Sequence, residues 1–127
     1  MAGSEGRRGR ITRSADFDRV YRSGRSHASR VFVLHSFPRG DEEPARLGLS
    51  VSRKVGGSVE RNKVKRLLKE AFAVEVSQVT PGTDIVVVAR GEASSFVEAK
   101  GLEGVQQELH ELLAQSGAMI SKDSTGG

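Results

Sequence analysis

Five polar side chains with helical spacing lie between residues 61 and 69 and could bind a polyanion. Arg61, Lys65 and Lys69 recur every four residues, and Asn62 and Arg66 form a parallel line beside them. Residues four apart share one face of a helix, so these groups project from adjoining ridges. Like charges at this spacing repel by about 0.2–0.5 kcal/mol per pair, which favours an anionic partner. For a lone cluster, ordinary solvated helix charges are an equally good explanation.

The residues around this block strengthen the binding interpretation. Arg53 and Lys54 add two cations, and Gly56 and Gly57 let the backbone approach a ligand closely. Asn62 is the only asparagine of the chain, and a mediocre helix former between cations fits a contact better than a scaffold role.

No catalytic or metal-binding set of residues can be recognised from spacing. The Walker phosphate-binding spacing is not met, and His110-Glu111 lacks the second histidine of a zinc protease. Within the predicted domain, the basic stretches 11–30 and 46–69 offer only Asp16, Asp18 and Glu60 as carboxylates, which are too few for a metal nuclease. No Ser/His/Asp set follows from spacing, and a chain without cysteine has no thiolate site. The sequence therefore predicts a binding protein with no catalytic or metal-ligating residues of its own.

The cations need a helix with an apolar inner stripe to position them. Apolar residues recur at i, i+3, i+4 and i+7, namely Val64, Leu67, Leu68 and Ala71. This pattern predicts a helix over residues 58–72, capped by Ser58, with one stripe against a core.

An earlier helix is predicted over residues 14–23, with Ser14 as N-cap and Gly24 as its stop. Phe17 and Tyr21 are then i, i+4 neighbours on one face. They either anchor the helix to the core or line a cleft, where exposed rings stack on unpaired bases at roughly 1–3 kcal/mol per base.

Three strands and a last helix complete the predicted elements. Residues 31–37 form a strand with Val33 and His35 on one face, and residues 47–53 form a second, antiparallel to the first if the loop 38–44 is a hairpin. Residues 84–90 read as a strand covered on both faces. The closing helix, residues 96–113, has an acidic outer face, and Gly101 and Gly104 can break its first turns.

The order α-β-β-α-β-α predicts one α+β domain with a small mixed sheet. Within the 127 residues we place this domain at 11–115, between disordered tails at 1–10, which is basic, and 116–127. No apolar run approaches a membrane span and the N-terminus lacks a signal peptide; with no cysteine, these features fit a cytoplasmic protein.

Charge is unevenly distributed along the chain. Residues 46–69 contain eight Lys/Arg and one acid, whereas residues 70–127 contain three Lys/Arg and nine acids. This polarity indicates an oriented anionic partner such as nucleic acid. A membrane is not predicted as partner, because the apolar stripe of the basic helix is needed for the core.

The run RLGLSVSRKVGGSVERNKVKRLLKEAF, residues 46–72, closely resembles the protein subunit of bacterial ribonuclease P. The family signature is a K-x-G-x-x-V-x-R-N-x-x-K-R block on a helix. The matching positions here are Lys54, Gly56, Val59, Arg61, Asn62, Lys65 and Arg66. The likeness extends upstream through SADFDRVYRSGR and RVFVLHSF and downstream to DIVVVAR, so it covers nearly the whole predicted domain.

The resemblance implies an RNA-binding subunit of a ribonucleoprotein whose RNA performs the catalysis. This complex removes the 5′ leader from precursor tRNA with Mg²⁺ bound mainly by RNA, and the protein binds the leader and broadens substrate recognition. The implied partners are the catalytic RNA and precursor tRNA, with no obligate protein partner. The implied fold is an α/β sandwich of ribosomal-protein type, with a left-handed βαβ crossover through the basic helix.

The resemblance also implies a role for each matching residue. The catalytic RNA would contact Arg53, Lys54, Arg61, Asn62, Lys65, Arg66 and Lys69. The leader cleft, between the first helix and the sheet, would be lined by Phe17, Tyr21, Val33 and His35. Three positions depart from the family: lysines stand at 63 and 69 where arginine is usual, and His35 stands where tyrosine is common.

Two other functions fit the same residues. A general RNA-binding or ribosome-associated module would use the same basic helix, and an independent nuclease would cleave RNA as protein alone. Reconstitution with a bacterial ribonuclease P RNA at low magnesium separates these alternatives from the ribonuclease P subunit.

Overall fold

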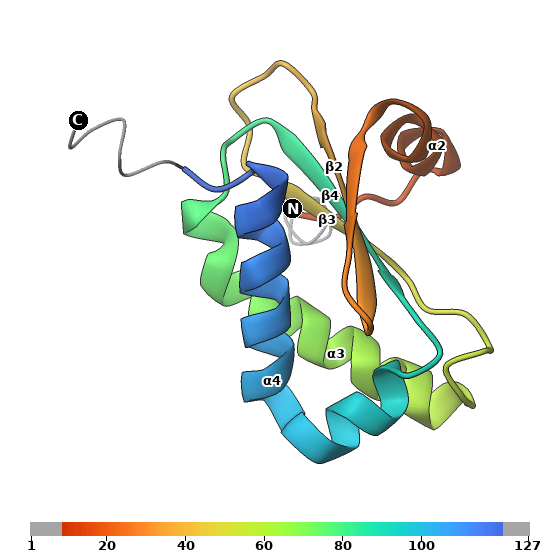
Figure 1. The fold of residues 1–127 in the computed structure, drawn as a ribbon. Coiled ribbons are helices and arrows are strands. Elements are labelled where there is room, and N and C mark those ends of the chain that lie inside the picture. The colour runs from red at the N-terminus through yellow and green to blue at the C-terminus, as the bar shows by residue number, and fades with distance from the viewer. Residues whose placement is uncertain (1–8, 121–127) are drawn as a thin grey trace, which may run out of the picture.

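The computed structural model describes residues 9–120, which form a mixed sheet packed with helices (Figure 1). The elements in chain order are α2 (Ser14–Ser23), β1 (Arg25–Ala28), β2 (Phe32–Pro38), β3 (Arg46–Ser50), α3 (Ser58–Glu75), the 3-10 helix η1 (Val76–Gln78), β4 (Thr83–Ala89) and α4 (Ala93–Ser116). The strand order is β1-β2-β4-β3, with β3 and β4 parallel and the other pairs antiparallel. The predicted α+β class with a small mixed sheet is confirmed.

The strand β1 was missed in the sequence prediction. Its four residues, Arg25 to Ala28, are polar or small and mostly exposed, so they carry no apolar alternation. Pairing with β2 holds them in place, with Arg25 opposite Ser36 and Ala28 opposite Val33. An edge strand of this kind is specified by its partner rather than by its own side chains.

The predicted hairpin between β2 and β3 is wrong, because β4 lies between these two strands. Ile85, Val86 and Val87 of β4 are fully buried, and such a strand needs a neighbour on each side and cover on both faces. The chain therefore runs from β3 through α3 to the parallel strand β4, which is a βαβ crossover. The left hand of this crossover stays a prediction from the resemblance.

A buried ion-pair cluster fixes the end of β4. Asp84 is fully buried and accepts two hydrogen bonds from Arg46 of β3, each 2.8 Å long, and a third from Arg39. Hydrogen bonds to Asp41 and Asp84 raise the pKa of Arg39, and the hydrogen bond to Asp84 raises that of Arg46. Loss of Asp84 would leave the buried guanidinium of Arg39 without this carboxylate partner. The cluster therefore holds the loop after β2 and strand β3 against β4.

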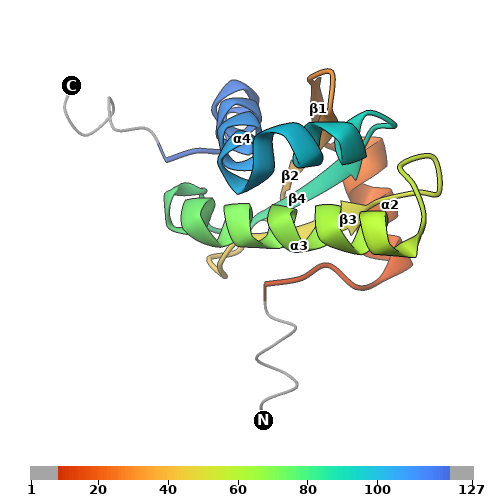
Figure 2. The same cartoon turned by 90° about the horizontal axis from the view of Figure 1, so that it is seen from below.

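The larger core lies between the sheet and the two long helices. The predicted stripe of α3 is confirmed, since Val64, Leu67, Leu68 and Ala71 are all buried. α4 packs beside α3 on the same face of the sheet (Figure 2). Its helix is interrupted at Gly101, whose φ of 62° is non-helical, as the sequence allowed, whereas Gly104 continues the helix.

A smaller core lies on the opposite face, where α2 packs (Figure 1). Val20 of α2, Ile11 and Val86 form its buried part. Val86 faces this core while Ile85 and Val87 face the larger one, so the predicted coverage of β4 on both faces is confirmed.

The helix starts differ by one residue from the predicted caps. Arg13 and Gly57 are the N-cap residues of α2 and α3, so Ser14 and Ser58, which were predicted as caps, are the first helical residues. Neither N-cap residue makes a side-chain capping bond. Gly24 ends α2 as predicted, donating its N–H to the carbonyl of Val20. A Cβ at Gly24 would lie 2.4 Å from the carbonyl oxygen of Ser36, so this close approach of α2 to β2 requires glycine.

Ordered contacts extend past both predicted domain boundaries. At the N-terminal end, Gly9 and Ile11 hydrogen-bond to Leu47 of β3. At the C-terminal end, residues 116–120 finish α4 and pair with the segment after η1, for example through the bridge between Val79 and Met119. The rest of the two predicted tails, residues 1–8 and 121–127, lies outside the described residues. No helix in the part that the structure describes has the length and apolar character to cross a bilayer.

Candidate nucleic-acid interface

The side of α3 turned away from the core forms one continuous polar surface. Its residues surround a shallow hollow of about 600 Å³ and are Val59, Asn62, Lys63, Lys65, Arg66 and Lys69. We call this the α3 basic surface. It brings together four of the residues that the resemblance assigns to RNA, Asn62, Lys65, Arg66 and Lys69.

The cations of this surface are only weakly neutralised. Lys63 reaches Glu98 of α4 at 3.5 Å and Arg66 reaches Glu70 at 3.6 Å, and all four side chains are substantially exposed. Glu70 stands one step beyond Arg66 on the line that begins at Asn62, so that line ends in an acid. Exposed ion pairs of this kind contribute about 0–1 kcal/mol to the free energy of unfolding. Within residues 9–120, Lys65 and Lys69 have no ion pair, which leaves their charge available to an anion.

Arg61, Arg53 and Lys54 lie toward the start of α3 and outside this hollow. Arg61 is half-buried, and its Nε is a buried donor with no hydrogen-bond partner among the described residues. Arg53 and Lys54 are exposed in the turn that precedes the helix, where Gly56 donates to the carbonyl of Arg53. All three therefore stand near the N-terminal end of α3, whose free N–H groups favour an anion.

The aromatic residues predicted for a leader cleft form a chain of ring contacts across α2 and β2. The rings of Phe17 and Tyr21 are 6.3 Å apart, and those of Tyr21 and His35 meet edge to face at 5.0 Å. Val33 lies two residues before His35, on the same face of β2, and is also half-buried. Tyr21 is 40% exposed, so its ring remains accessible beside the sheet. We call these four residues the aromatic cluster.

His35 occupies an apolar setting within this cluster. Partial burial lowers the pKa of its imidazole, since removal from water disfavours the charged form. The neutral ring is therefore favoured at neutral pH, and a neutral ring meets Tyr21 edge to face without carrying an unpaired charge.

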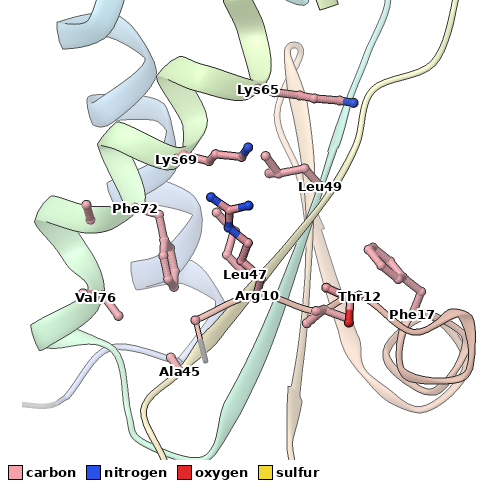
Figure 3. Close-up of a pocket in the computed structure, with 13 residues that line it drawn as sticks. Arg10, Thr12, Phe17, Ala45, Leu47, Leu49, Lys65, Lys69, Phe72 and Val76 are labelled. Carbon is pink, nitrogen blue, oxygen red and sulfur yellow. The ribbon is translucent and has the colours of Figure 1, made fainter. Parts of the chain in front are cut away.

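A second hollow, of about 490 Å³, lies between α3 and the edge strand β3, and we call it the β3 groove (Figure 3). The thirteen residues that line it are Gly9, Arg10, Ile11, Thr12, Phe17, Ala45, Leu47, Leu49, Lys65, Lys69, Phe72, Ala73 and Val76. Phe17 is the one member of the aromatic cluster in this groove; Tyr21, Val33 and His35 do not line it. Lys65 and Lys69 line both the groove and the α3 basic surface.

Sequence reasoning missed most of this groove. Arg10 was assigned to a disordered tail, but it forms a parallel bridge with Leu47 and its side chain points into the groove (Figure 3). No local sequence pattern predicts this position of Arg10, because only the fold brings Arg10 and Leu47 together. One signal for the groove was present in the sequence. Phe72 and Ala73 are apolar residues that follow the basic residues near the end of α3.

The described residues offer no group of three or more His, Asp or Glu side chains that could hold a metal ion. The acids that do cluster, around Asp84, are already paired with Arg39 and Arg46. The positive charge of the α3 basic surface favours the binding of anions, and the accessible ring of Tyr21 can contact planar groups.

Comparison with known proteins identifies one family. The sequence profile of the family described as Ribonuclease P matches residues 6–117. The ribonuclease P protein component of Shouchella clausii is 41% identical over 118 residues, covering 91% of this chain and 96% of the relative. That of Staphylococcus aureus strain Mu3 is 38% identical over 104 residues, covering 82% and 86%.

Solved structures give the same result for the fold. The RNase P protein of Staphylococcus aureus superposes with a TM-score of 0.78 at 36% identity, covering 87% of this chain and 97% of that one. The RNase P protein of Thermotoga maritima, solved with 1-(4-fluorophenyl)-2-thiourea, gives 0.75 at 33% identity, covering 82% and 96%. The chain thus belongs to the family of ribonuclease P protein components, the protein part of a tRNA-processing ribonucleoprotein enzyme.

Proposed function

We propose that this protein binds the RNA subunit of ribonuclease P through the α3 basic surface and assists that RNA in removing the 5′ leader of precursor tRNA. The observation that carries the proposal is the convergence of Asn62, Lys65, Arg66 and Lys69 on one face of a helix whose other face is buried. Arg53, Lys54 and Arg61 extend the positive charge to the start of the helix.

Counterion release would supply free energy for this binding. Each phosphate that a Lys or Arg neutralises releases condensed cations, so RNA binding gains free energy from these side chains at moderate salt. The unpaired state of Lys65 and Lys69 in the described residues supports this role, because no carboxylate competes with the phosphate.

The aromatic cluster is proposed to hold the single-stranded leader of precursor tRNA. Phe17, Tyr21 and His35 offer rings, and Val33 an apolar surface, beside a partly open face of the sheet. Unpaired bases stack on such rings with little sequence preference, which suits a subunit that broadens substrate recognition.

Catalysis is assigned to the RNA subunit, and Mg²⁺ to sites formed mainly by RNA phosphates. The described residues lack a set that would hold the ion, so the protein would contribute position and positive charge rather than ligands.

Reconstitution tests the proposal. The full-length protein is added to a bacterial ribonuclease P RNA at a magnesium concentration where the RNA alone is nearly inactive, and cleavage of precursor tRNA is measured. We expect strong stimulation, and none from the protein without RNA. Binding of RNA without stimulation would indicate a general RNA-binding module, and cleavage by protein alone would indicate an independent nuclease.

A further inference from the structure

We infer that the β3 groove is a pocket for one unpaired nucleotide of the ribonuclease P RNA subunit, with its base between α3 and β3 and its phosphate at Lys65 and Lys69. This inference rests on the proposed function and adds a specific subsite to it. The site is separate from the aromatic cluster, with which it shares only Phe17.

The groove has the size and lining of a ligand pocket. Its volume of about 490 Å³ falls within the roughly 300–1,000 Å³ that small-molecule sites occupy. Leu47 and Leu49 of β3 form one wall, and Phe72 of α3 and Val76 of η1 form the other (Figure 3). Phe72 is buried, but Leu49 and Val76 are half-buried, so a planar base can pack against their side chains between the two apolar walls.

Three cations converge at the mouth of this pocket. Arg10, Lys65 and Lys69 all line it, and their side chains point into it from the N-terminal segment and from α3 (Figure 3). None of the residues that line the groove is acidic, and no ion pair involves these three among residues 9–120. Converging like charges raise the free energy of the unbound protein, and a phosphate would reverse that cost.

The edge of β3 supplies an unused hydrogen-bonding pair. Leu47 donates its N–H to Gly9 (2.9 Å) and accepts from Ile11 (3.0 Å) on the side of β3 away from β4. Groups alternate along a strand, so Leu49 also directs its N–H and C=O away from β4, and neither has a partner in the described part of the chain. A neighbouring donor and acceptor complement the edge of a base.

The shared lysines identify the source of the nucleotide. Lys65 and Lys69 belong to the α3 basic surface as well as to the groove, so an RNA strand that contacts Asn62 and Arg66 reaches the groove mouth without a break. Tyr21 and His35, which we assign to the leader, do not line it. We therefore commit to the RNA subunit rather than to the precursor tRNA leader.

The test fills the pocket without removing a charge. Ala73→Leu adds three carbons to an exposed helical residue that lines the groove, and Ala114→Leu makes the same change at an exposed position of α4, away from the groove. Both full-length variants are reconstituted with a bacterial ribonuclease P RNA. We expect Ala73→Leu to weaken assembly by roughly 5- to 140-fold, the range for losing the contacts of one base, and Ala114→Leu to leave it unchanged.

Base-reactive chemical probing locates the nucleotide. One unpaired base should be protected in the wild-type complex and reactive with Ala73→Leu, while other protections persist. Removing that base from the RNA should weaken binding of the wild-type protein by the same factor and add nothing to Ala73→Leu. The RNA without this base is tested with the wild-type protein alone. That measurement therefore remains decisive even if thermal unfolding shows that Ala73→Leu is not folded.

Three results would overturn the pocket. These are no base released by Ala73→Leu, equal losses for Ala73→Leu and Ala114→Leu, or a loss confined to substrates that carry a leader. Arg66→Ala in the same assay separates this failure from failure of the proposed function. If Arg66→Ala weakens assembly while Ala73→Leu does not, the α3 basic surface stands and only the pocket is lost.

Discussion

The two faces of the sheet are covered very differently. On one face α3 and α4 bury the larger core, which includes Phe32, Leu34 and Leu68 at zero exposure. On the other face the short helix α2 covers a core of three buried residues, and leaves Val33, His35 and Tyr21 partly open to solvent. The closed face therefore buries most of the apolar core, and the open face keeps accessible side chains that can contact a ligand.

The largest expected effect tests the closed face. Leu68→Ala should lower the free energy of unfolding by about 2–5 kcal/mol, because it leaves a cavity in the larger core. Val33→Ala removes less apolar surface from a half-buried site and should cost less than half as much. Chemical denaturation measures both, and equal losses would break the distinction between the two faces.

The next effect tests the open face. Tyr21→Ala should weaken binding of precursor tRNA with a leader by roughly 1–3 kcal/mol if a base stacks on this ring, and leave binding of mature tRNA unchanged. The exposed ring contributes little to folding, so the unfolding midpoint should stay near that of the wild type. Equal losses of affinity for precursor and mature tRNA would indicate that Tyr21 has a structural role and does not bind the leader.

A smaller effect concerns the outer side of the closed face. Arg66→Ala should reduce the slope of log affinity for the RNA subunit against log salt by about 0.7–0.9, the share of one phosphate contact. Glu103→Ala, on the acidic outer side of α4, is the matched control and should leave the slope unchanged. An unchanged slope with Arg66→Ala would remove this residue from the RNA interface.

The smallest effect is the pH dependence at His35. Burial lowers the pKa of His35 in the folded protein, so the unfolded chain binds a proton more readily. Stability should therefore fall as the pH drops below the ordinary histidine pKa of about 6.5. Unfolding of the wild type and of His35→Phe at pH 7.5 and 5.5 isolates this contribution, because the variant keeps His27 and His110. A larger acid loss in the variant would contradict the sign.

Local periodicity predicted the parts of the molecule that depend on one segment alone. The apolar stripe of α3, the two faces of β2 and the double coverage of β4 follow from spacing, because the repeat of a helix or strand is set by its own backbone geometry. The end of α2 at Gly24 follows from residue type, whereas residue type offered Gly101 and Gly104 equally as breaks in α4 and only Gly101 is one. The family signature lies on one such segment, which is why residues 46–72 were sufficient for the resemblance.

Only the tertiary structure decided which segments meet. The insertion of β4 between β2 and β3, the pairing of β1, and the Asp84 cluster with Arg39 and Arg46 each join residues distant in sequence. Arg10 likewise enters the β3 groove through its bridge to Leu47, far along the chain. Strand pairing depends on which strand edges are free as the chain folds, and distant segments compete for these edges. The outcome of this competition does not appear as a periodic pattern in any one segment.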